Sequence, residues 1–340
     1  MSAPSRRRST GPSIEDVARL AGVSAQTVSR VSTGATNVRP VTRDKVLQAM
    51  EQLGYTPNHA ARALRNGAFH TIGLMAHRFE RTGESLTTSA VIEAARAADY
   101  GVTIVNVQGQ EAEGWESAAS RLSSQAIDGL VILRAETTPE MLSLPRSLPV
   151  AVSDSRLMGL YPAVSSDHAQ GSSAATTHLL RLGHRNIHHI GGPIDSDPAM
   201  ARAAGWRRTL EQAGINAPEA LHGDWSAESG YLLGRRLAAD PSVTAIFCAN
   251  DEMAIGALRA LHEAGRDVPG DVSVVGFDDL TLSAFLPSPL TTVRQDFHRI
   301  GEELVQLVLA QIKARERLPQ QRVMIPTELV VRGTTAAPRA

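Results

Sequence analysis

Residues 13–32, SIEDVARLAGVSAQTVSRVS, constrain the fold of this chain more than any other segment. The pattern predicts two short helices joined by a tight turn. Ser13 and Asp16 have the spacing of a capping box, which places a carboxylate at the positive end of the first helix. Gly22 fits the C′ position at which that helix ends, and Ser24 can cap a second helix. The segment is therefore predicted to be a helical hairpin.

The second helix of this hairpin has one apolar and one polar face. Val28 and Val31 face inward at helical spacing. The outer face carries small, amide, hydroxyl and guanidinium side chains, namely Ala25, Gln26, Ser29 and Arg30. A helix needs such a row to read base edges in the major groove of DNA. Helical hairpins are also common in packed cores, so the surrounding sequence has to decide between the two interpretations.

The charge distribution favours the DNA-reading interpretation. The net charge is −1, yet residues 1–66 hold ten Arg and Lys and only four Asp and Glu, which leaves 24 basic and 31 acidic residues for the rest. Basic side chains neutralise DNA phosphates, and an acidic body avoids nonspecific adhesion. The alternative, a disordered basic arm, is expected for residues 1–12. It does not explain the basic residues on or beside the predicted helices.

A third amphipathic helix is predicted at 42–53, capped by Thr42 and ended by Gly54, with Val46 and Met50 on its inner face. Three helices within 13–57 make a small DNA-binding head.

The segment 58–67 follows this head and is predicted to form a short helix of its own. The helix runs from Asn58 for about eight residues, and helices shorter than roughly 12 residues are marginal in water. On its own, this segment should be mostly unfolded.

Residues 70–333 are predicted to form a separate α/β body, because apolar β-branched runs alternate with helical segments. The expected strands are 71–76, 102–107, 128–133, 148–154, 186–192, 245–251 and 271–279. The expected helices are 89–98, 170–182, 199–213, 229–239, 251–264 and 299–314. Such alternation predicts parallel, doubly wound sheets, and a body of this length suits two lobes.

Polar residues end several of the expected strands. Asp154, Asn250 and Asp278 stand at strand ends, and His77 follows the first strand. Ligands of open α/β sheets bind beyond the carboxyl ends of the strands, and this set of acceptors and amides suits a ligand with many hydroxyl groups. Trp225 can stack on a sugar ring. Equally, Asn250 and Asp278 can cap helices or turns, and Trp225 can be a core aromatic.

Both predicted parts of the chain match one known family. In the head the match runs without a gap through Asp16-Val17-Ala18, Ala21-Gly22-Val23-Ser24, Thr27-Val28-Ser29-Arg30-Val31, Thr42-Arg43, Lys45-Val46 and Gly54-Tyr55-Thr56-Pro57-Asn58. In the body it continues through Leu182-Gly183-His184, Ala249-Asn250-Asp251, Val274-Val275-Gly276-Phe277-Asp278-Asp279 and Pro289-Leu290-Thr291-Thr292-Val293. With these residues the chain resembles the lactose-repressor (LacI/GalR) family of bacterial transcription regulators.

The resemblance implies a helix-turn-helix head that reads a near-palindromic operator in double-stranded DNA. It implies that 58–67 is a hinge helix that folds only on DNA, with Leu64 wedged into a minor-groove step. Ala25 offers little beyond contact with a thymine methyl group, whereas Gln26 can pair with adenine. The implied DNA-binding positions are Ser13, Ser24, Ala25, Gln26, Thr27, Ser29, Arg30, Asn37, Thr42, Arg43, Tyr55, Asn58, Ala61 and Leu64.

For the body, the resemblance implies a fold like that of a periplasmic sugar-binding protein, with two lobes, three crossovers and an effector in the cleft. The N-lobe is expected at 70–167 and 297–325, the C-lobe at 168–296 and 326–333, and a tail at 334–340. The implied effector contacts are His77, Asp154, Arg202, Trp225, Asn250, Asp278 and Gln295. An interlobe salt bridge between Arg202 and Asp278 is the structural alternative for that pair.

Enzyme and metal functions are not expected, and neither is a cofactor. His188 and His189 are adjacent on a predicted strand and so point to opposite faces, which prevents them from sharing one metal. Cys248 lies in an apolar strand, where an inert buried thiol is the norm. P-loop, GxGxxG and GxSxG motifs are absent from the sequence.

We therefore expect a cytoplasmic, nucleoid-associated bacterial repressor that a small carbohydrate in the cleft, such as a galactoside or another disaccharide, releases from its operator. Trp225 and the acidic cleft favour a neutral sugar. The alternatives are a corepressor-dependent repressor of the purine type and, more remotely, a sugar-binding transport protein. The second of these would need an export signal and would have no DNA-binding head.

A homodimer is expected, because a three-helix head reads only a few base pairs and specific binding needs two heads. By resemblance, the dimer face lies on the N-lobe around Val91, Ile92 and Ala95. No leucine heptads follow Val331, so a tetramer held by a coiled coil is not expected.

Overall fold

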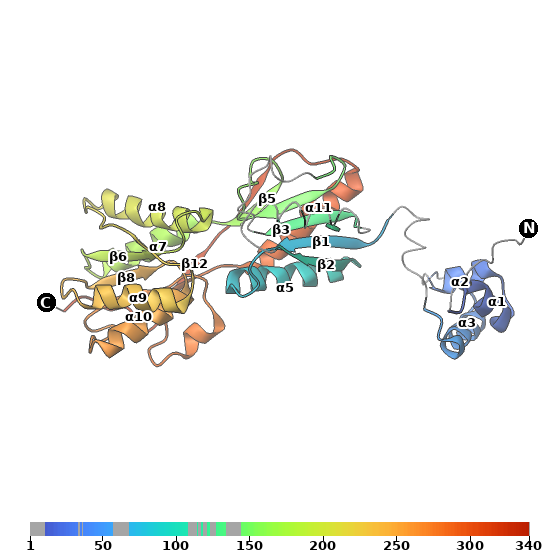
Figure 1. Cartoon of the computed structure of the whole chain (residues 1–340), viewed down its shortest axis with the longest axis horizontal. Coiled ribbons are helices and arrows are strands. Elements are labelled where there is room, and N and C mark those ends of the chain that lie inside the picture. The colour runs from blue at the N-terminus through green and yellow to red at the C-terminus, as the bar shows by residue number, and fades with distance from the viewer. Residues whose placement is uncertain are drawn as a thin grey trace, which may run out of the picture. The chain divides into compact units, whose positions relative to one another are not determined.

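The computed structural model describes residues 11–32, 35, 37–56, 68–107, 114, 117, 121–122, 127–133 and 144–339. The chain divides into two compact units, Met1–Phe69 and His70–Ala340. The first unit contains the head and the second the α/β body (Figure 1). None of the described helices is long and apolar enough to cross a membrane.

The head consists of α1 (Ile14–Ala21), α2 (Ala25–Ser32) and α3 (Pro40–Leu53). The predicted capping box of α1 is confirmed, because the Ser13 hydroxyl accepts from the Asp16 amide at 3.3 Å and the Asp16 carboxylate accepts from the Ser13 amide at 3.0 Å. Val17, Val28 and Val46, one from each helix, are fully buried and form the centre of the core. The head is thus held together by apolar contacts among three short helices.

The third helix begins earlier than the sequence pattern predicts. Its first residue is Pro40 and Arg39 is its N-cap, so Thr42 lies in the first turn and is not the cap. Proline is well suited to this position, because the first turn of a helix does not need its N–H group. Gly54 ends the helix as predicted, in the left-handed conformation with φ of 61°.

The N-lobe of the body has a parallel sheet, which in the described part of the chain has six strands in the order β11-β5-β4-β3-β1-β2. The strands are β1 (Thr71–Ala76), β2 (Gly101–Asn106), β3 (Gly129–Leu133), β4 (Val150–Ser153), β5 (Ala163–Ser166) and β11 (Arg322–Ile325). Leu74 and Val131 pack on one face of the sheet, whereas Met75 and Ile132 pack on the other. Both faces are buried, as in doubly wound folds.

Two helices, α5 (Thr82–Ala97) and α11 (Phe297–Ala314), pack together against this sheet. α5 begins well before the expected helix 89–98. The sequence pattern did not predict its first two turns, because they are mostly polar and carry no apolar periodicity. This early start brings its N-terminus close to the end of β1.

The expected dimer face on α5 is wrong for two of its three residues. Val91 and Ala95 are fully buried in the core of their own lobe, where α5 meets α11 and the sheet. Only Ile92 is partly exposed, at 37%. The apolar side of this helix stabilises the lobe itself.

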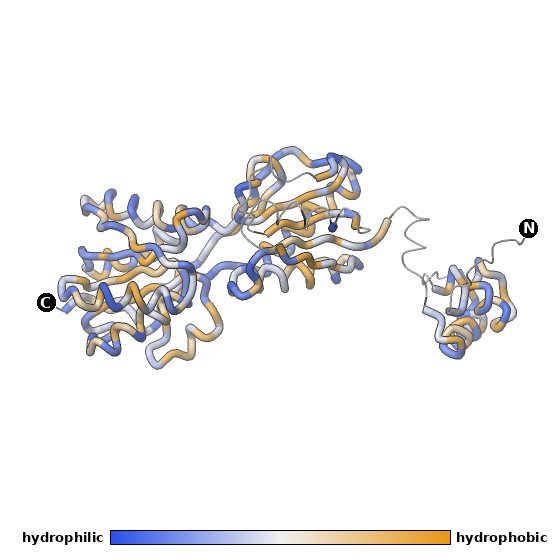
Figure 2. The backbone as a smooth tube through the Cα atoms, in the orientation of Figure 1, coloured by the Kyte–Doolittle hydropathy of each residue, from blue (hydrophilic) through white to orange (hydrophobic). Residues whose placement is uncertain are grey.

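The C-lobe has a parallel sheet of four strands within the described residues, in the order β7-β6-β8-β9. The strands are β6 (Ile187–Gly191), β7 (Leu221–His222), β8 (Ala245–Cys248) and β9 (Ser273–Val275). The helices are α7 (His168–Arg181), α8 (Asp197–Gln212), α9 (Ala227–Ala238) and α10 (Asp251–Glu263). α7 and α8 cover one face and α9 and α10 the other, and Figure 2 shows apolar residues concentrated along the strands between them.

Close packing of α9 against α10 depends on glycine. A Cβ atom on Gly256 would lie 1.9 Å from the carbonyl oxygen of Ala227, and one on Gly230 would lie 2.2 Å from that of Met253. The two helices therefore touch through their backbones, which fixes the residues at the N-terminus of α10.

Within the described residues the chain passes between the lobes three times: from β5 to α7, from β10 (Thr292–Arg294) to α11, and from β11 to β12 (Glu328–Val330). β10 and β12 pair in antiparallel fashion, with Thr292 opposite Val330. The second and third crossovers are therefore linked by hydrogen bonds.

The segment after β12 packs onto the C-lobe and does not extend as the expected tail 334–340. Thr334 is fully buried and donates its hydroxyl to the carbonyl of Val274 at 2.7 Å. Arg339 forms ion pairs with Asp267 at 3.0 Å and with Asp271 at 2.7 Å. The C-lobe thus includes residues up to 339.

Asp251, the first residue of α10, is fully buried and joins three segments of the C-lobe. Its carboxylate accepts from the Leu280 amide at 2.8 Å, the Ser283 hydroxyl at 2.7 Å and the Thr292 hydroxyl at 2.5 Å. Burial nevertheless raises the pKa of Asp251 from 3.8 to about 6, because desolvation of the carboxylate outweighs these bonds.

This raised pKa predicts a pH-dependent stability. The folded state binds the Asp251 proton more tightly than the unfolded chain does, so the stabilisation is complete below the unfolded pKa of 3.8 and is lost as the pH rises through about 6. Between pH 4 and 7 the wild type should lose on the order of 2 kcal/mol relative to Asp251→Asn. Urea unfolding of both proteins over this range measures the difference, and parallel pH profiles would contradict the prediction.

Candidate functional site

The second helix of the head presents the side chains that the sequence predicts for base reading. Gln26 and Arg30 are exposed on α2, on the side opposite to the buried Val28. They are four residues apart and so project from the same face. Ser24 caps this helix, since its hydroxyl accepts from the Thr27 amide at 3.2 Å.

The other predicted DNA contacts fall into two groups. Asn37 is exposed, whereas the half-buried positions are Ala25, Thr27, Ser29, Thr42, Arg43 and Tyr55. Ser13 is exposed and caps α1. The remaining predicted contacts, Asn58, Ala61 and Leu64, lie outside the described residues, as do the hinge helix 58–67 and the first ten residues of the basic arm 1–12.

Arg43 has a structural contact that the sequence did not indicate. Its Nη2 donates to the carbonyl of Ala35 at 2.6 Å, and its Nε is buried without a hydrogen-bond partner in the described part of the chain. The side chain therefore fixes the segment that precedes α3.

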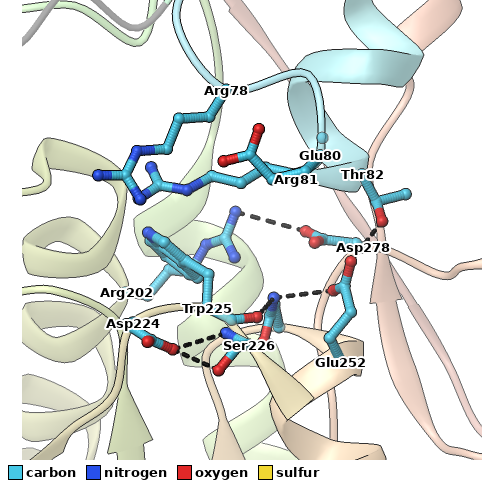
Figure 3. Close-up of a pocket in the computed structure, with 12 residues that line it drawn as sticks. Arg78, Glu80, Arg81, Thr82, Arg202, Asp224, Trp225, Ser226, Glu252 and Asp278 are labelled. Carbon is cyan, nitrogen blue, oxygen red and sulfur yellow. Dashed lines mark hydrogen bonds and ion pairs between the residues drawn. The ribbon is translucent and has the colours of Figure 1, made fainter. Parts of the chain in front are cut away.

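In the body, a cleft of about 240 Å³ lies beyond the carboxyl ends of the strands, where sheets of this class bind ligands. One wall follows β1 and belongs to the N-lobe, and the other consists of segments after β8 and β9 and the loop before α9. Figure 3 shows the two walls. The lining residues are Arg78, Glu80, Arg81, Thr82, Gly83, Arg202, Asp224, Trp225, Ser226, Asn250, Glu252 and Asp278.

Arg202, on α8, is the most buried charged residue of this lining, at 1% exposed. Its Nη2 lies 3.5 Å from Oδ1 of Asp278, and its Nη1 donates to the carbonyl of Ala249. Its guanidinium carbon lies 3.8 Å from the ring centroid of Phe277 and 5.4 Å from that of Trp225. The salt bridge considered as a structural alternative is thus present, and it lines the cleft.

His168 connects this arginine to Asp154. Its Nδ1 accepts from Nη2 of Arg202 at 3.3 Å, and its Nε2 lies 3.2 Å from Oδ1 of Asp154. Because a guanidinium can only donate, Nδ1 is the acceptor and Nε2 carries the proton that is donated to Asp154. Asp154 also accepts from the Ser165 hydroxyl at 2.6 Å. A continuous hydrogen-bonded chain therefore runs from β5 to the cleft.

Gln295 extends the same chain on the other side. Its Nε2 donates to Oδ1 of Asp278 at 2.5 Å, while its Oε1 is buried and has no hydrogen-bond partner within the described ranges. It follows β10, at the second crossover between the lobes. Gln295 thus contacts a cleft residue without being part of the lining.

Asn250 caps a helix and lines the cleft at once. Its Oδ1 accepts from the Met253 amide at 2.9 Å, which caps α10. Its Nδ2 donates to the carbonyl of Trp225 at 2.9 Å and to Glu252 at 2.8 Å. Asn250 is therefore both a helix cap and a cleft residue, the two roles that the sequence left open.

Trp225 is largely a core residue. It is 7% exposed, belongs to the apolar core between the C-lobe sheet and α9 and α10, and lies so close to Gly192 that a Cβ there would be 2.6 Å from the indole. Its Nε1 is buried and has no hydrogen-bond partner among the residues described. Only a small part of the ring can contact a ligand.

Backbone strain is concentrated in this region. Asp278 has φ of 118°, Trp225 of 77° and Asp154 of 44°, values that residues other than glycine rarely adopt. Such strain persists only where surrounding contacts enforce it, and it is found most often at functional sites.

The structure thus brings together most of the predicted effector contacts. Arg202, Trp225, Asn250 and Asp278 line the cleft, and Asp154 and Gln295 support them. His77 is half-buried and is not part of the lining. His168 was not predicted from the sequence, and neither were the lining residues Arg78, Glu80, Arg81, Thr82, Gly83, Asp224, Ser226 and Glu252. Most of them stand next to a predicted strand end or to Trp225, which was the available signal.

Metal binding finds no support in the described residues, where no three His, Cys, Asp or Glu side chains are placed to hold an ion. His189 is fully buried, and burial lowers its pKa to about 4, whereas His188 is half-buried on the other face of β6. Cys248 is a buried thiol whose pKa is raised by desolvation. It is therefore unreactive at neutral pH.

Comparison with known proteins agrees with this division into head and body. Residues 13–58 match the profile of bacterial regulatory proteins of the lacI family, and residues 176–335 match a periplasmic binding protein-like domain. The HTH-type transcriptional repressor PurR of Haemophilus influenzae (strain PittEE) is 33% identical over 327 residues, which cover 94% of this chain and 97% of that protein.

Two further similarities concern a sugar-operon repressor. The lactose operon repressor of Escherichia coli (strain K12) is 34% identical over 334 residues, which cover 96% of this chain and 93% of that protein. The crystal structure of the lac repressor dimer bound to operator and the anti-inducer ONPF has a TM-score of 0.85 at 32% identity, and the match covers 96% of this chain and 100% of that chain. The chain therefore belongs to the lacI family of bacterial regulatory proteins, as a DNA-binding transcriptional repressor and not an enzyme.

Proposed function

We propose that this repressor binds an operator as a homodimer through α2 of each head and is released when a small carbohydrate binds in the body cleft. The observation that carries the proposal is the buried pair of Arg202 and Asp278 in a cleft lined almost entirely by hydrogen-bonding side chains. Such a lining suits a ligand whose surface consists of hydroxyl groups.

The cleft argues for a carbohydrate more than for a purine. A flat base is recognised largely by stacking on aromatic rings, and the one aromatic residue of the lining, Trp225, is 7% exposed. The volume of about 240 Å³ lies just below the range of roughly 300–1,000 Å³ that is common for ligand sites. A ligand of monosaccharide size is therefore favoured over a disaccharide. The similarity to PurR and to the lactose operon repressor is nearly equal and does not separate the two ligand classes.

Release of DNA requires only that the ligand favour one arrangement of the body over another. We infer that the hinge helix predicted at 58–67, which lies outside the described residues, is too short to be stable alone and folds only on DNA and beside its copy in the dimer. A ligand that shifts the N-lobes of the dimer raises the cost of forming the two hinge helices together. By thermodynamic linkage, the operator then weakens ligand binding by the same factor by which the ligand weakens operator binding.

Gln26→Ala should lower affinity for the operator by about 1–3 kcal/mol and relax the preference at one base pair per half-site, because the side chain reads a base edge. Fluorescence anisotropy on an operator selected from random-sequence DNA measures both effects. Gln48→Ala is the matched control, since Gln48 is an exposed glutamine on α3. Unchanged affinity and base preference in Gln26→Ala would refute the role of α2 as recognition helix.

A carbohydrate that occupies the cleft should stabilise the protein by about 2.7 kcal/mol at 100 times its dissociation constant. Thermal unfolding measured in the presence of neutral monosaccharides, disaccharides or purine bases identifies the chemical class of the effector. Asp278→Asn should abolish the shift, because Arg202 loses its charged partner and the ligand loses an acceptor, a cost of about 1–3 kcal/mol.

Asp195→Asn, an exposed carboxylate, serves as the control. Operator binding by Asp278→Asn without ligand should equal that of the wild type. Loss of operator binding in that variant would assign the ion pair a purely structural role, and a thermal shift with purine bases alone would refute the carbohydrate.

A further inference from the structure

Two arginines that the sequence analysis did not single out form part of the N-lobe wall of the cleft. Arg78 and Arg81 follow β1, and Figure 3 shows their side chains running along the same edge of the site, above Trp225 and Arg202. The Arg81 side chain is 12% exposed and forms an ion pair with Glu84 at 3.9 Å. The Arg78 guanidinium makes no hydrogen bond or ion pair with a residue that the structure describes.

A buried glutamate holds these arginines in place. Glu84 is 1% exposed and accepts from the backbone amide of Arg78 at 2.8 Å, while it also pairs with Arg81. This contact fixes the turn between β1 and α5 before any ligand binds. The backbone that carries both arginines is therefore preorganised, which lowers the entropic cost of binding an anion.

The same wall contains the N-terminus of α5, a helix of 16 residues. Its N-cap is Arg81, and no side chain of a described residue caps its amides. Thr82 and Gly83, the first two residues of the helix, line the cleft. Uncapped amides at the positive end of a helix bind anions.

The two walls differ in charge. The N-lobe lining has two arginines and one carboxylate, the exposed Glu80, whereas the C-lobe lining has three carboxylates and one arginine, Arg202. Hydrogen bonds from the Ser226 hydroxyl and amide keep the pKa of Asp224 below its ordinary value, so this carboxylate is ionised at neutral pH. Glu252 accepts from Asn250 at 2.8 Å and from Thr82 across the cleft. Asp278 is neutralised by Arg202. The remaining lone pairs of Asp224 and Glu252 can accept hydrogen bonds from ligand hydroxyls but would repel an anion.

From this separation of charge we propose that the effector is a carbohydrate with an anionic group, a phosphate or a carboxylate. Arg78, Arg81 and the first turn of α5 hold the anion, and the C-lobe wall accepts from the hydroxyls. The inference rests on the proposed carbohydrate effector and replaces the neutral sugar expected from the sequence, which did not place these arginines in the cleft.

Calorimetric titration of the full-length protein with matched sugars tests the charge of the ligand. The panel consists of glucose, galactose, fructose and ribose, each compared with its phosphate ester and with its aldonic or uronic acid where one exists. At least one anionic member should bind and its neutral parent should bind tenfold or more weakly. Comparison of the phosphate esters with the sugar acids then shows whether the anionic group is a phosphate or a carboxylate.

Substitutions in the wall give the second test. Arg78→Gln and Arg81→Gln should each weaken the anionic sugar by about 10- to 100-fold, as expected for a lost charge-assisted hydrogen bond. Arg96→Gln, an exposed arginine on the same helix, should leave the affinity unchanged.

Three results would overturn the proposal: no binding by any anionic sugar, equal affinity for a neutral parent, or full affinity in Arg78→Gln. Binding of a neutral sugar alone would leave the carbohydrate effector standing, whereas binding of purine bases alone would refute both.

Discussion

The ion pair between Arg202 and Asp278 is the interaction on which the ligand cleft depends. A buried charge pair is costly to desolvate and is favourable only when its remaining hydrogen-bonding groups are satisfied. Here His168, the Ala249 carbonyl and Gln295 satisfy them, and Phe277 packs against the guanidinium. Removal of one partner from such a pair typically costs about 3–5 kcal/mol.

This network also joins the places where the lobes connect. Asp154 and Ser165 belong to the N-lobe, His168 begins the helix after the first crossover, and Gln295 stands at the second. A ligand that contacts Arg202 or Asp278 therefore contacts residues bonded to both crossovers. Across the cleft, the hydrogen bond from Thr82 to Glu252 joins the two walls directly. Movement of one lobe against the other must alter these bonds, and this gives a bound ligand a physical means of favouring one arrangement.

The sequence predicted much of the fold because its signals were local. Capping residues such as Ser13 and Gly22 and buried strands such as 71–76 have patterns that neighbouring residues determine. Short strands were missed, since β5, β7, β10, β11 and β12 have at most four residues each and no periodicity to detect. Expected strands 245–251 and 271–279 were too long because Asn250 and Asp278 belong to the loops that follow.

The effector contacts were predicted less completely than the fold. Asp154, Asn250 and Asp278 could be proposed because they follow strong strands. His168 could not, because its role depends on the approach of Arg202 from a helix 34 residues away. Arg78 and Arg81 looked like ordinary loop residues, and only the early start of α5 and the buried Glu84 place them in the cleft.

The central claim is that ligand in the cleft and operator on the head oppose each other. Calorimetric titration of the stabilising sugar into free protein and into protein saturated with its selected operator measures this coupling most directly. The account predicts that the sugar binds roughly 5- to 150-fold more weakly to the operator complex, by the same factor by which the sugar weakens operator binding. Equal sugar affinity for the free and the operator-bound protein would contradict it.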